Sequence, residues 1–529
     1  MNLTETIKVE MKKKLNIELS IHQVNDDELI KQIAAKKCHV AKDSITGIDY
    51  LKRSLDVRGK KFRYHLQMEV YANEPFPQKE IIKEKYREVS DKKQVLIVGA
   101  GPAGYFAALE LLEYGIKPVI FERGKDVRAR RRDIRNLQQE GRVDPDSNYC
   151  FGEGGAGAYS DGKLYTRSKK RGNIRKVLQI LVEHGGNQDI LVDAHPHIGS
   201  NKLPKIITKI RETILEYGGE IHFESRVTDI IKNDRQAFGL VINEDEEVFG
   251  DAVILATGHS ARDIYYLFDK RKIHIEAKPF AIGFRIEHPR ELIDTIQYGK
   301  NYPEELPTAA YSLATQVGKS GVYSFCMCPG GIIVPSATNQ DELVVNGMSM
   351  SRRNSKYSNS GIVSSVTDED FAEFNEYGEL RGMKFQESLE KKFYTGHKDN
   401  LMKAPAQKMS DFISGKESKE LNGCSYIPGL ISKDLTKLFT RKLTKNLQRG
   451  LLDFGKKMHG YHTESANVVG IESRTSSPVR ITRDKESFAH LQLRNLFPCG
   501  EGAGYAGGIV SSAADGQNAA LAVAKMLNM

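Results

Sequence analysis

A glycine-rich turn stands where an apolar run gives way to a helical pattern. The run QVLIV is typical of a buried strand, and Gly99-Ala-Gly101-Pro102-Ala103-Gly104 then opens an apolar helix. In such a turn the first glycine permits a tight bend, the second lets the backbone approach a pyrophosphate, and the third lets the helix pack close to the strand. Free N–H groups at the helix start attract phosphate. The pattern predicts that Gly99, Gly101, Pro102, Ala103 and Gly104 bind a dinucleotide, with an ordinary tight turn as the alternative.

A carboxylate follows at the spacing that ribose binding requires. The next apolar run, PVIFE, ends at Glu122. In dinucleotide folds an acid roughly 20 residues beyond the glycine turn accepts hydrogen bonds from the ribose hydroxyls. Strand, glycines, helix and acid together indicate a dinucleotide fold far more strongly than the glycines alone. They do not distinguish FAD from NAD.

Three further glycine-containing segments decide between these cofactors by resemblance. They are FGEGGAGAYSDGKL at 151–164, VILATG at 253–258 and LFPCGEGAGYAGGI at 496–509. With the glycine turn, they make nearly the whole chain resemble the FAD-dependent dehydrogenases of the two-dinucleotide-binding-motif flavoprotein superfamily. The likeness is greatest to a bacterial branch of largely uncharacterised members. The resemblance implies a flavoprotein oxidoreductase with FAD as its cofactor.

The same resemblance implies which residues contact FAD. The loop at 151–164 passes the pyrophosphate and the flavin, and Glu501 takes the place of the acid that holds the ribityl chain, where many relatives have Asp. The helix after Gly507 and Gly508 directs its N-terminus at the flavin pyrimidine edge, where its dipole stabilises negative charge. Besides the glycine turn and Glu122, the expected cofactor contacts are Arg123, Arg130, Gly154, Gly155, Ser160, Asp161, Val227, Thr257, Gly258, Gly500, Glu501, Gly507, Gly508 and Ile509.

A second glycine pattern does not predict a second nucleotide fold. Gly502, Gly504 and Gly507 also have GxGxxG spacing, but too little chain follows for another strand with a ribose acid. We interpret this segment as flavin contact, so a dedicated NAD(P)H domain is not expected. NAD(P)H stays open only as a transient electron donor, and no metal site is predicted.

Side chains for chemistry on a substrate are less sharply defined. His259 directly follows the ATG segment, and its neighbours face the cofactor in similar proteins. Arg285, His288 and Arg474 lie in two stretches that resemble the same dehydrogenase family. Each of the four is a candidate for binding an acidic substrate or transferring a proton. For Arg285, His288 and Arg474 a structural ion pair is the favoured alternative.

Cys326 and Cys328 are separated by a single residue. A dithiol beside a flavin can shuttle electrons, but the disulfide-reductase families place two cysteines four residues apart, directly after the first nucleotide motif. Alternation along a strand would point both side chains to one face. We expect a pocket wall or plain core here, with a redox-active dithiol as the less favoured alternative.

The elements that position these residues alternate between strands and helices, which predicts a parallel sheet. We predict an α/β fold with a Rossmann-like three-layer FAD-binding domain, an inserted substrate domain and a small α+β N-terminal domain. The boundaries are 1–92 for the N-terminal domain with its linker, 93–275 and 465–529 for the FAD-binding domain, and 276–464 for the insert. Within the N-terminal domain, the apolar pattern predicts strands at 4–11 and 62–71 and a helix at 26–37.

The composition fits a globular protein of several domains. The chain has 529 residues, of which 40% are hydrophobic and 28% charged. No secretory signal or membrane span is visible, and six cysteines without a paired framework indicate a reducing compartment, so we expect a cytoplasmic protein. The net charge of +9 is modest, and the basic residues between 52 and 63 fit a solvated face better than a nucleic-acid interface.

The sequence therefore predicts an enzyme, an FAD-dependent oxidoreductase. It would transfer hydride or electrons through flavin N5, to or from a small molecule that the sequence does not identify. Two alternatives remain open. One is an RNA-associated flavoenzyme, and the other is a non-catalytic redox sensor that holds a flavin.

Overall fold

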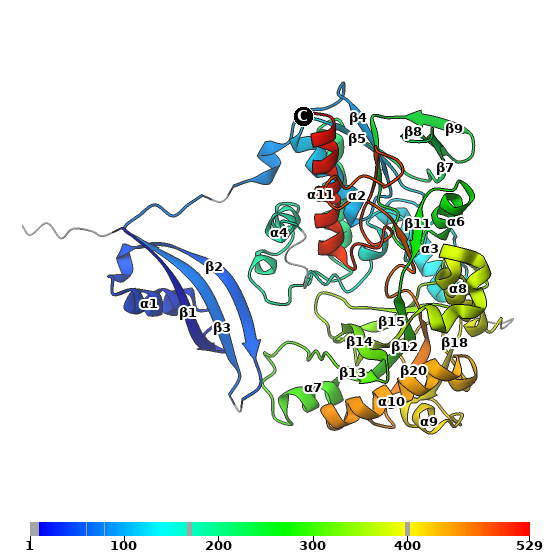
Figure 1. The fold of residues 1–529 in the computed structure, drawn as a ribbon. Helices are drawn as coiled ribbons and strands as arrows, with labels where there is room; N and C mark the ends of the chain where they lie inside the picture. The colour runs from blue at the N-terminus through cyan, green and yellow to red at the C-terminus, as the bar shows by residue number, and fades with distance from the viewer. Residues whose placement is uncertain (1–9, 60, 79, 167–171, 397–401, 529) are drawn as a thin grey trace, which may run out of the picture.

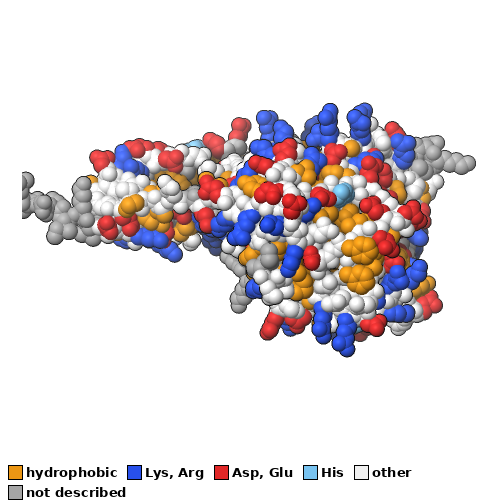
Figure 2. Space-filling view, turned by 90° about the horizontal axis from the view of Figure 1, so that it is seen from above, with side chains coloured by type: hydrophobic (Ala, Val, Ile, Leu, Met, Phe, Trp, Pro, Cys, Tyr) orange, Lys and Arg blue, Asp and Glu red, His pale blue; other side chains and the backbone are white. Residues whose placement is uncertain are grey.

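The computed structural model describes residues 10–59, 61–78, 80–166, 172–396 and 402–528. Figure 1 shows a small N-terminal unit at the left, a helix-covered parallel sheet at the upper right, and a second, larger sheet below it. In Figure 2 the lysine and arginine side chains of the upper face are interleaved with aspartate and glutamate, over the N-terminal unit as well as the main body. Within the described residues, no helix combines the length and apolar character needed to cross a membrane.

The N-terminal unit is an antiparallel sheet with one helix. Its strands are β1 (Met11–Ser20), β2 (Ile45–Asp56) and β3 (Arg63–Ala72), in the order β1-β3-β2, and α1 (Asp27–Cys38) packs on one face. Alternate residues of β1 point at α1, which gives the unit its own apolar core. The predicted helix and second strand are present, each shifted by one residue. Residues 4–9 of the first predicted strand lie outside the described residues.

A short backbone bridge joins this unit to the main body. The Arg53 N–H in β2 donates to the Val192 carbonyl at 2.8 Å, and the Ala194 N–H donates to the Arg53 carbonyl at 2.8 Å. The Arg53 guanidinium also pairs with Asp189 and Asp193. The connecting segment contains one short 3₁₀ helix, η2 (Ile82–Lys85), and a second, η1 (Lys42–Ser44), precedes β2.

The parallel sheet is the middle one of three layers, as predicted. Its strands are β4 (Gln94–Val98), β5 (Lys117–Phe121), β6 (Glu220–His222), β10 (Ala252–Leu255) and β22 (Leu496–Pro498), in the order β22-β10-β4-β5-β6. Residues 95 and 97 of β4 face a layer of helices, whereas residues 96 and 98 face the antiparallel meander of β7 (Val227–Lys232), β8 (Ala237–Ile242) and β9 (Glu246–Phe249). The continuous apolar character of QVLIV follows from this burial on both faces.

Two helices cross closely above the glycine turn. They are α2 (Pro102–Glu113) and α11 (Ile509–Met526), which lie side by side in Figure 1. A Cβ added to Gly516 of α11 would lie 2.0 Å from the Ala103 carbonyl oxygen, so the backbones meet directly. The remaining helices of this unit are α3 (Val127–Glu140), α4 (Ile174–Glu183), α5 (Leu203–Glu216), α6 (Arg262–Lys270), η3 (Gly155–Gly157) and η4 (Gln188–Leu191).

The insert is built on a seven-stranded sheet in the order β13-β14-β17-β12-β20-β18-β19. These strands are β12 (Phe280–Pro289), β13 (Ala314–Val317), β14 (Ser320–Cys328), β17 (Tyr357–Val366), β18 (Ala404–Lys408), β19 (Leu430–Ser432) and β20 (Asn467–Glu472). A separate hairpin consists of β15 (Ile332–Pro335) and β16 (Val345–Met348). The helices are α7 (Arg290–Tyr298), η5 (Asp368–Leu380), α8 (Arg381–Phe393), α9 (Met409–Ser414), η6 (Leu435–Lys437) and α10 (Arg441–Lys457).

The second boundary of the insert lies later than predicted. Strand β20 falls within the predicted range 465–529 of the FAD-binding domain, yet it pairs with β12 and β18 in the seven-stranded sheet. All six of its residues are buried, because it is a central strand with both faces covered. The chain returns through β21 (Val479–Ile481), which pairs with β11 (Ile275–Ala277).

Candidate functional site

A cavity of about 380 Å³ opens at the carboxyl ends of the parallel strands. Its lining includes the residues that follow β4, β5, β10 and β22 on one side and residues of β14 and β16 on the other. In open α/β sheets this edge is where ligands bind, because the strand ends and helix starts converge there.

Most residues predicted at the cofactor line this cavity. They are Gly99, Gly101, Pro102, Ala103, Glu122, Arg123, Gly155, Ser160, Asp161, Val227, Thr257, Gly258, Gly500, Glu501, Gly507, Gly508 and Ile509. Of the catalytic candidates, His259 and Arg474 line it as well.

The glycines divide into those that pack and those that face open space. A Cβ at Gly104 would lie 2.0 Å from the Gly99 carbonyl oxygen, so this glycine lets α2 approach β4. A Cβ at Gly101 would meet nothing closer than 3.9 Å, and those at Gly258 and Gly507 would meet nothing within 4 Å. Side chains at these three positions would project into the cavity. Their absence leaves its wall accessible to a ligand that contacts the backbone, as a dinucleotide does.

Glu122 ties the glycine turn to the next loop. Its carboxylate accepts hydrogen bonds from the N–H groups of Ala100 at 2.8 Å, Gly152 at 2.9 Å and Gly124 at 3.0 Å. A carboxylate has about four acceptor positions, so one remains for a ligand hydroxyl. Glu122 therefore shapes the cavity as well as lining it.

Like Gly104, two further residues of the predicted set, Arg130 and Gly154, have packing roles and do not line the cavity. Arg130 is fully buried and donates to the backbone carbonyls of residues 148, 149, 152 and 153, so it holds the glycine loop rather than facing the cavity. Gly154 packs against Ile207, where a Cβ would lie 2.4 Å from Cδ1. Arg123 does line the cavity, between Asp146 and Asp263, with its guanidinium 4.3 Å from the Phe151 ring centre.

His259 and Glu501 form a polar pair in the wall of the cavity. The His259 Nδ1 lies 3.4 Å from the Glu501 carboxylate, whereas its Nε2 is buried and has no hydrogen-bond partner among the described residues. The positive end of the α11 dipole is close by, because this helix begins at Ile509, which also lines the cavity. The unpartnered nitrogen is the kind of group that a bound molecule satisfies.

Arg285 and His288 do not reach the cavity. The Arg285 Nε is 2.9 Å from the Glu472 carboxylate in a fully buried ion pair, which is the structural alternative that the sequence favoured. His288 lies against the Tyr461 ring, with Nε2 2.9 Å from the Tyr461 carbonyl oxygen. Burial lowers the pKa of His288 to about 4, so this imidazole is neutral near pH 7. Both side chains belong to the core of the insert.

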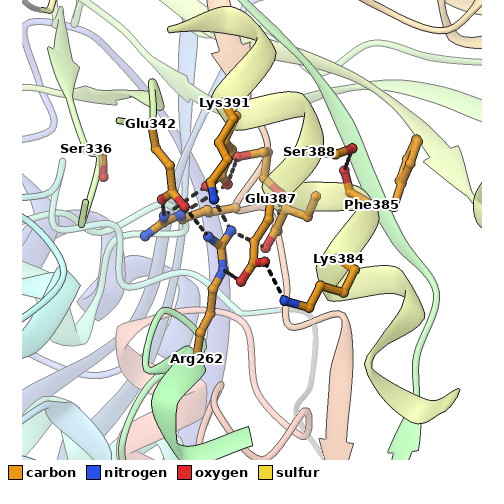
Figure 3. Close-up of polar contacts among 12 residues, drawn as sticks. Arg262, Ser336, Glu342, Lys384, Phe385, Glu387, Ser388 and Lys391 are labelled. Carbon is orange, nitrogen blue, oxygen red and sulfur yellow. Dashed lines mark hydrogen bonds and ion pairs between the residues drawn. The ribbon is translucent and has the colours of Figure 1, made fainter. Parts of the chain in front are cut away.

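Arg474 lines the cavity and belongs to a buried charge cluster, of which Figure 3 labels Arg262, Glu342 and Glu387. Arg262 of α6 and Arg474 both contact Glu342 and Glu390, at 2.8 to 3.3 Å. In Figure 3, Glu387 of α8 points at Arg262 and receives Lys384 from its other side. Burial disfavours ionisation of Glu390, but the two arginines outweigh it and lower the pKa of Glu390 to about 2. The cluster joins the two large units by paired charges.

The sequence did not predict a contact between the glycine loop and strand β14. The Lys163 Nζ lies 3.4 Å from the Cys326 sulfur and 3.6 Å from the Cys328 sulfur. The alternation expected at the two cysteines is interrupted, since the pairing of β14 with β17 shifts register between Phe325 and Cys328. Lys163 and Cys326 line the cavity. Lys163 lies inside the quoted loop motif, but no local pattern indicates which strand that loop meets.

Comparison with known proteins places these features in a family. A model described as "FAD-dependent protein, C-terminal domain-like" matches residues 279–475, one described as "FAD binding domain" matches 92–136, and a domain of unknown function matches 11–71. An uncharacterised protein of Clostridium beijerinckii is 39% identical over 95% of this chain and 96% of its own length.

Solved structures with similarity to the chain include flavoproteins. CtdE in complex with FAD is 12% identical, with 83% of this chain and 88% of that chain covered and a TM-score of 0.34. A geranylgeranyl bacteriochlorophyll reductase-like protein of Thermoplasma acidophilum is 13% identical, with 83% and 79% covered and a TM-score of 0.33.

Proposed function

Since the chain belongs to a family of FAD-dependent proteins, with FAD as the cofactor, we propose that it is an oxidoreductase acting on a small molecule. The observation that carries this proposal is the cavity whose wall is left open at Gly101, Gly258 and Gly507. These three positions come from segments far apart in the sequence. They meet only at the strand ends, where a dinucleotide is recognised through the backbone.

The pyrophosphate is assigned to the start of α2. Gly101 precedes the first turn of this helix, and Gly155 lies in the facing loop. A Cβ added to Gly155 would lie 3.2 Å from the Gly101 Cα, so the two backbones are close together. The free N–H groups and the dipole of α2 attract phosphate at this point. Glu122 is proposed to accept a hydrogen bond from a hydroxyl group of the adenosine ribose at its remaining acceptor position.

The flavin is assigned to the end of the cavity that holds His259, Glu501 and the start of α11. Bound FAD supplies two-electron transfer at flavin N5. His259 Nδ1 lies 3.4 Å from the Glu501 carboxylate, and a proton on Nδ1 would leave Nε2 as an acceptor for a bound molecule. His259 is therefore suited to take a proton from a substrate. NAD(P)H is proposed only as a transient donor, because the glycine turn is assigned to FAD.

The test is to purify the protein, release its ligand by denaturation and identify it by mass spectrometry. We expect FAD in the supernatant. The holoprotein is then screened anaerobically with reductants, including NADH and NADPH, and with acceptors, while the flavin absorbance is followed. FMN alone, or no flavin after incubation with FAD, would end the proposal. Bound FAD that no reductant or acceptor turns over would instead favour a flavin-holding sensor.

A further inference from the structure

Strand β14 carries a bulge at the wall of the cavity. Three residue steps of β14, from Phe325 to Cys328, face two steps of β17, from Gly361 to Asn359. The extra residue interrupts the pairing with β17, and Cys326 has a φ of +45°, in the left-handed region that non-glycine residues rarely adopt. Bulges of this kind re-aim side chains next to functional sites. Here the bulge presents Cys326 to the cavity and leaves Cys328 fully buried behind it.

The ammonium group of Lys163 contacts the sulfur atoms of both Cys326 and Cys328. The Lys163 Nζ lies within 3.6 Å of each, and it comes from the loop that also lines the cofactor cavity. On its other side Lys163 is 3.6 Å from Asp161, whose carboxylate is held by Arg353 at 2.8 Å. The cation is therefore fixed by the loop and not free to turn toward solvent.

The bulge is also held from behind. Arg285 donates to the Cys326 carbonyl oxygen at 2.9 Å and pairs with Glu472. The Cys328 thiol lies 3.3 Å from the same carbonyl oxygen. A hydrogen bond from Cys328, together with the charges of Lys163 and Arg285, lowers the pKa of Cys326 well below that of a free thiol, although burial and Asp161 oppose this. Hydrogen bonding to Cys326 and burial raise the pKa of Cys328, so of the two sulfurs Cys326 is the one that ionises more readily.

We propose that Cys326 and Cys328 form a redox-active pair that exchanges two electrons with FAD in the adjoining cavity. Oxidation removes two electrons and one proton from the Cys326 thiolate and the Cys328 thiol and forms one S–S bond. The two electrons and the proton pass to oxidised FAD, which balances charge and atoms. This inference rests on the proposed function, because it requires FAD in the cavity.

The resulting disulfide is a transient one. Residues two apart on an extended strand have Cα atoms about 6.6–6.8 Å apart, at the outer limit for a disulfide. Ring closure therefore has to shift the bulge, whose Cys326 carbonyl oxygen is held by Arg285. A strained disulfide of this kind is readily reduced again, as a catalytic couple requires and a structural one does not. The substrate class that follows is a thiol or disulfide that reaches Cys326 through the cavity.

The experiment is an anaerobic dithionite titration of the purified holoprotein, preceded by oxidation with air. We expect wild type to take up four electrons per FAD, whereas Cys326→Ser and Cys328→Ser each take up two. Cys424→Ser is the control and should keep the four-electron capacity, because Cys424 lies beside Glu287 in the insert, away from the cavity. After alkylation, the Cys326–Cys328 peptide of the oxidised protein should carry no alkyl group and should be two mass units lighter than the unmodified dithiol peptide.

The outcomes separate this inference from the proposed function. Wild type that binds FAD but takes up only two electrons, with both thiols free after oxidation, overturns the redox pair and leaves the flavoenzyme intact. A protein that binds no FAD overturns both. Loss of two electrons in the Cys424 variant as well would place the second redox group elsewhere and would also overturn the pair.

Discussion

The two walls of the cavity are built on different principles. The wall at the parallel sheet presents backbone, because Gly101, Gly258 and Gly507 leave no side chain between the chain and a ligand. The wall at the insert presents functional groups, among them Cys326 and Arg474, each held by buried charges. A backbone wall can recognise a constant cofactor, whereas a side-chain wall can differ in chemistry from one protein to another. The predictions below test each wall in turn.

The largest effect is expected at the backbone wall. Gly101→Val should abolish FAD binding, because the valine side chain would occupy the space assigned to the pyrophosphate. The protein itself should stay folded, since the added Cβ meets nothing closer than 3.9 Å. Retained flavin absorbance after gel filtration is the measurement, and Gly59→Val, at another glycine with an open surround, is the control. Normal FAD content in Gly101→Val would show that the pyrophosphate lies elsewhere.

The charge cluster that joins the two large units should affect folding rather than cofactor binding. Arg262→Leu leaves Glu342 and Glu390 short of one buried partner, so the free energy of unfolding should fall by about 3–5 kcal/mol. Arg271→Leu, at the end of the same helix, breaks a partly exposed pair with Asp229 and should cost about 0–1 kcal/mol. Urea denaturation measures both. Equal losses would mean that the cluster contributes no more than a surface pair.

Acid should weaken the same cluster in a defined range of pH. The arginines hold the pKa of Glu390 at about 2, below the ordinary glutamate value of 4.5. A depressed carboxyl pKa stabilises the fold above the unfolded pKa, and this stability is lost as the pH falls from about 4.5 toward 2. Its size is on the order of 3 kcal/mol. The free energy of unfolding, measured by urea denaturation at several pH values from 6 to 3, should therefore fall more steeply for wild type than for Glu390→Gln. Equal slopes would contradict the assignment.

Glu122 links the two functions of the backbone wall. Glu122→Ala removes the carboxylate that accepts hydrogen bonds from three backbone N–H groups, and with it the proposed ribose contact, so FAD should bind more weakly by about 1.5–3 kcal/mol. A titration of the apoprotein with FAD gives the affinity, and thermal melting of the apoprotein separates binding from folding. An affinity equal to wild type would place the ribose away from Glu122.

The smallest effect is expected for the influence of Lys163 on Cys326 in the wall at the insert. Lys163→Met should raise the pKa of Cys326, because the cation beside the thiolate is lost, while Arg285 and Cys328 remain. The thiolate fraction near neutral pH then falls, and Cys326 should react with iodoacetamide about tenfold more slowly, equivalent to about 1.4 kcal/mol. Lys163→Arg should restore the rate. A pH profile of alkylation, read by peptide mass spectrometry, distinguishes this from a change in access.

The same contrast explains what the sequence could predict. The glycine turn, the acid at Glu122 and the strands around them are local patterns, and each lies where it was expected. Arg130 and Gly154 were misplaced because a spacing gives proximity to a loop, not the direction in which a side chain points. The same limit applies to Arg285 and His288, whose motifs lie in the core of the insert.

The contacts of the insert could not be predicted from the sequence for a different reason. The approach of Lys163 to Cys326 joins residues that are 163 positions apart, and it depends on a bulge whose register only the paired strands define. The late boundary at β20 is of the same kind. Its buried, β-branched sequence would fit either sheet, and only its partners β12 and β18 decide between them.

The short ribbon of β11 and β21 has a consequence for how such a molecule can diversify. The chain leaves the nucleotide unit along β11 and re-enters it along β21, and these two strands are neighbours. The entry and exit of the insert are thus side by side, so an exchange of this module during evolution need not re-thread the parallel sheet. A lineage can keep one cofactor-binding wall and acquire a new opposing wall in a single recombination event.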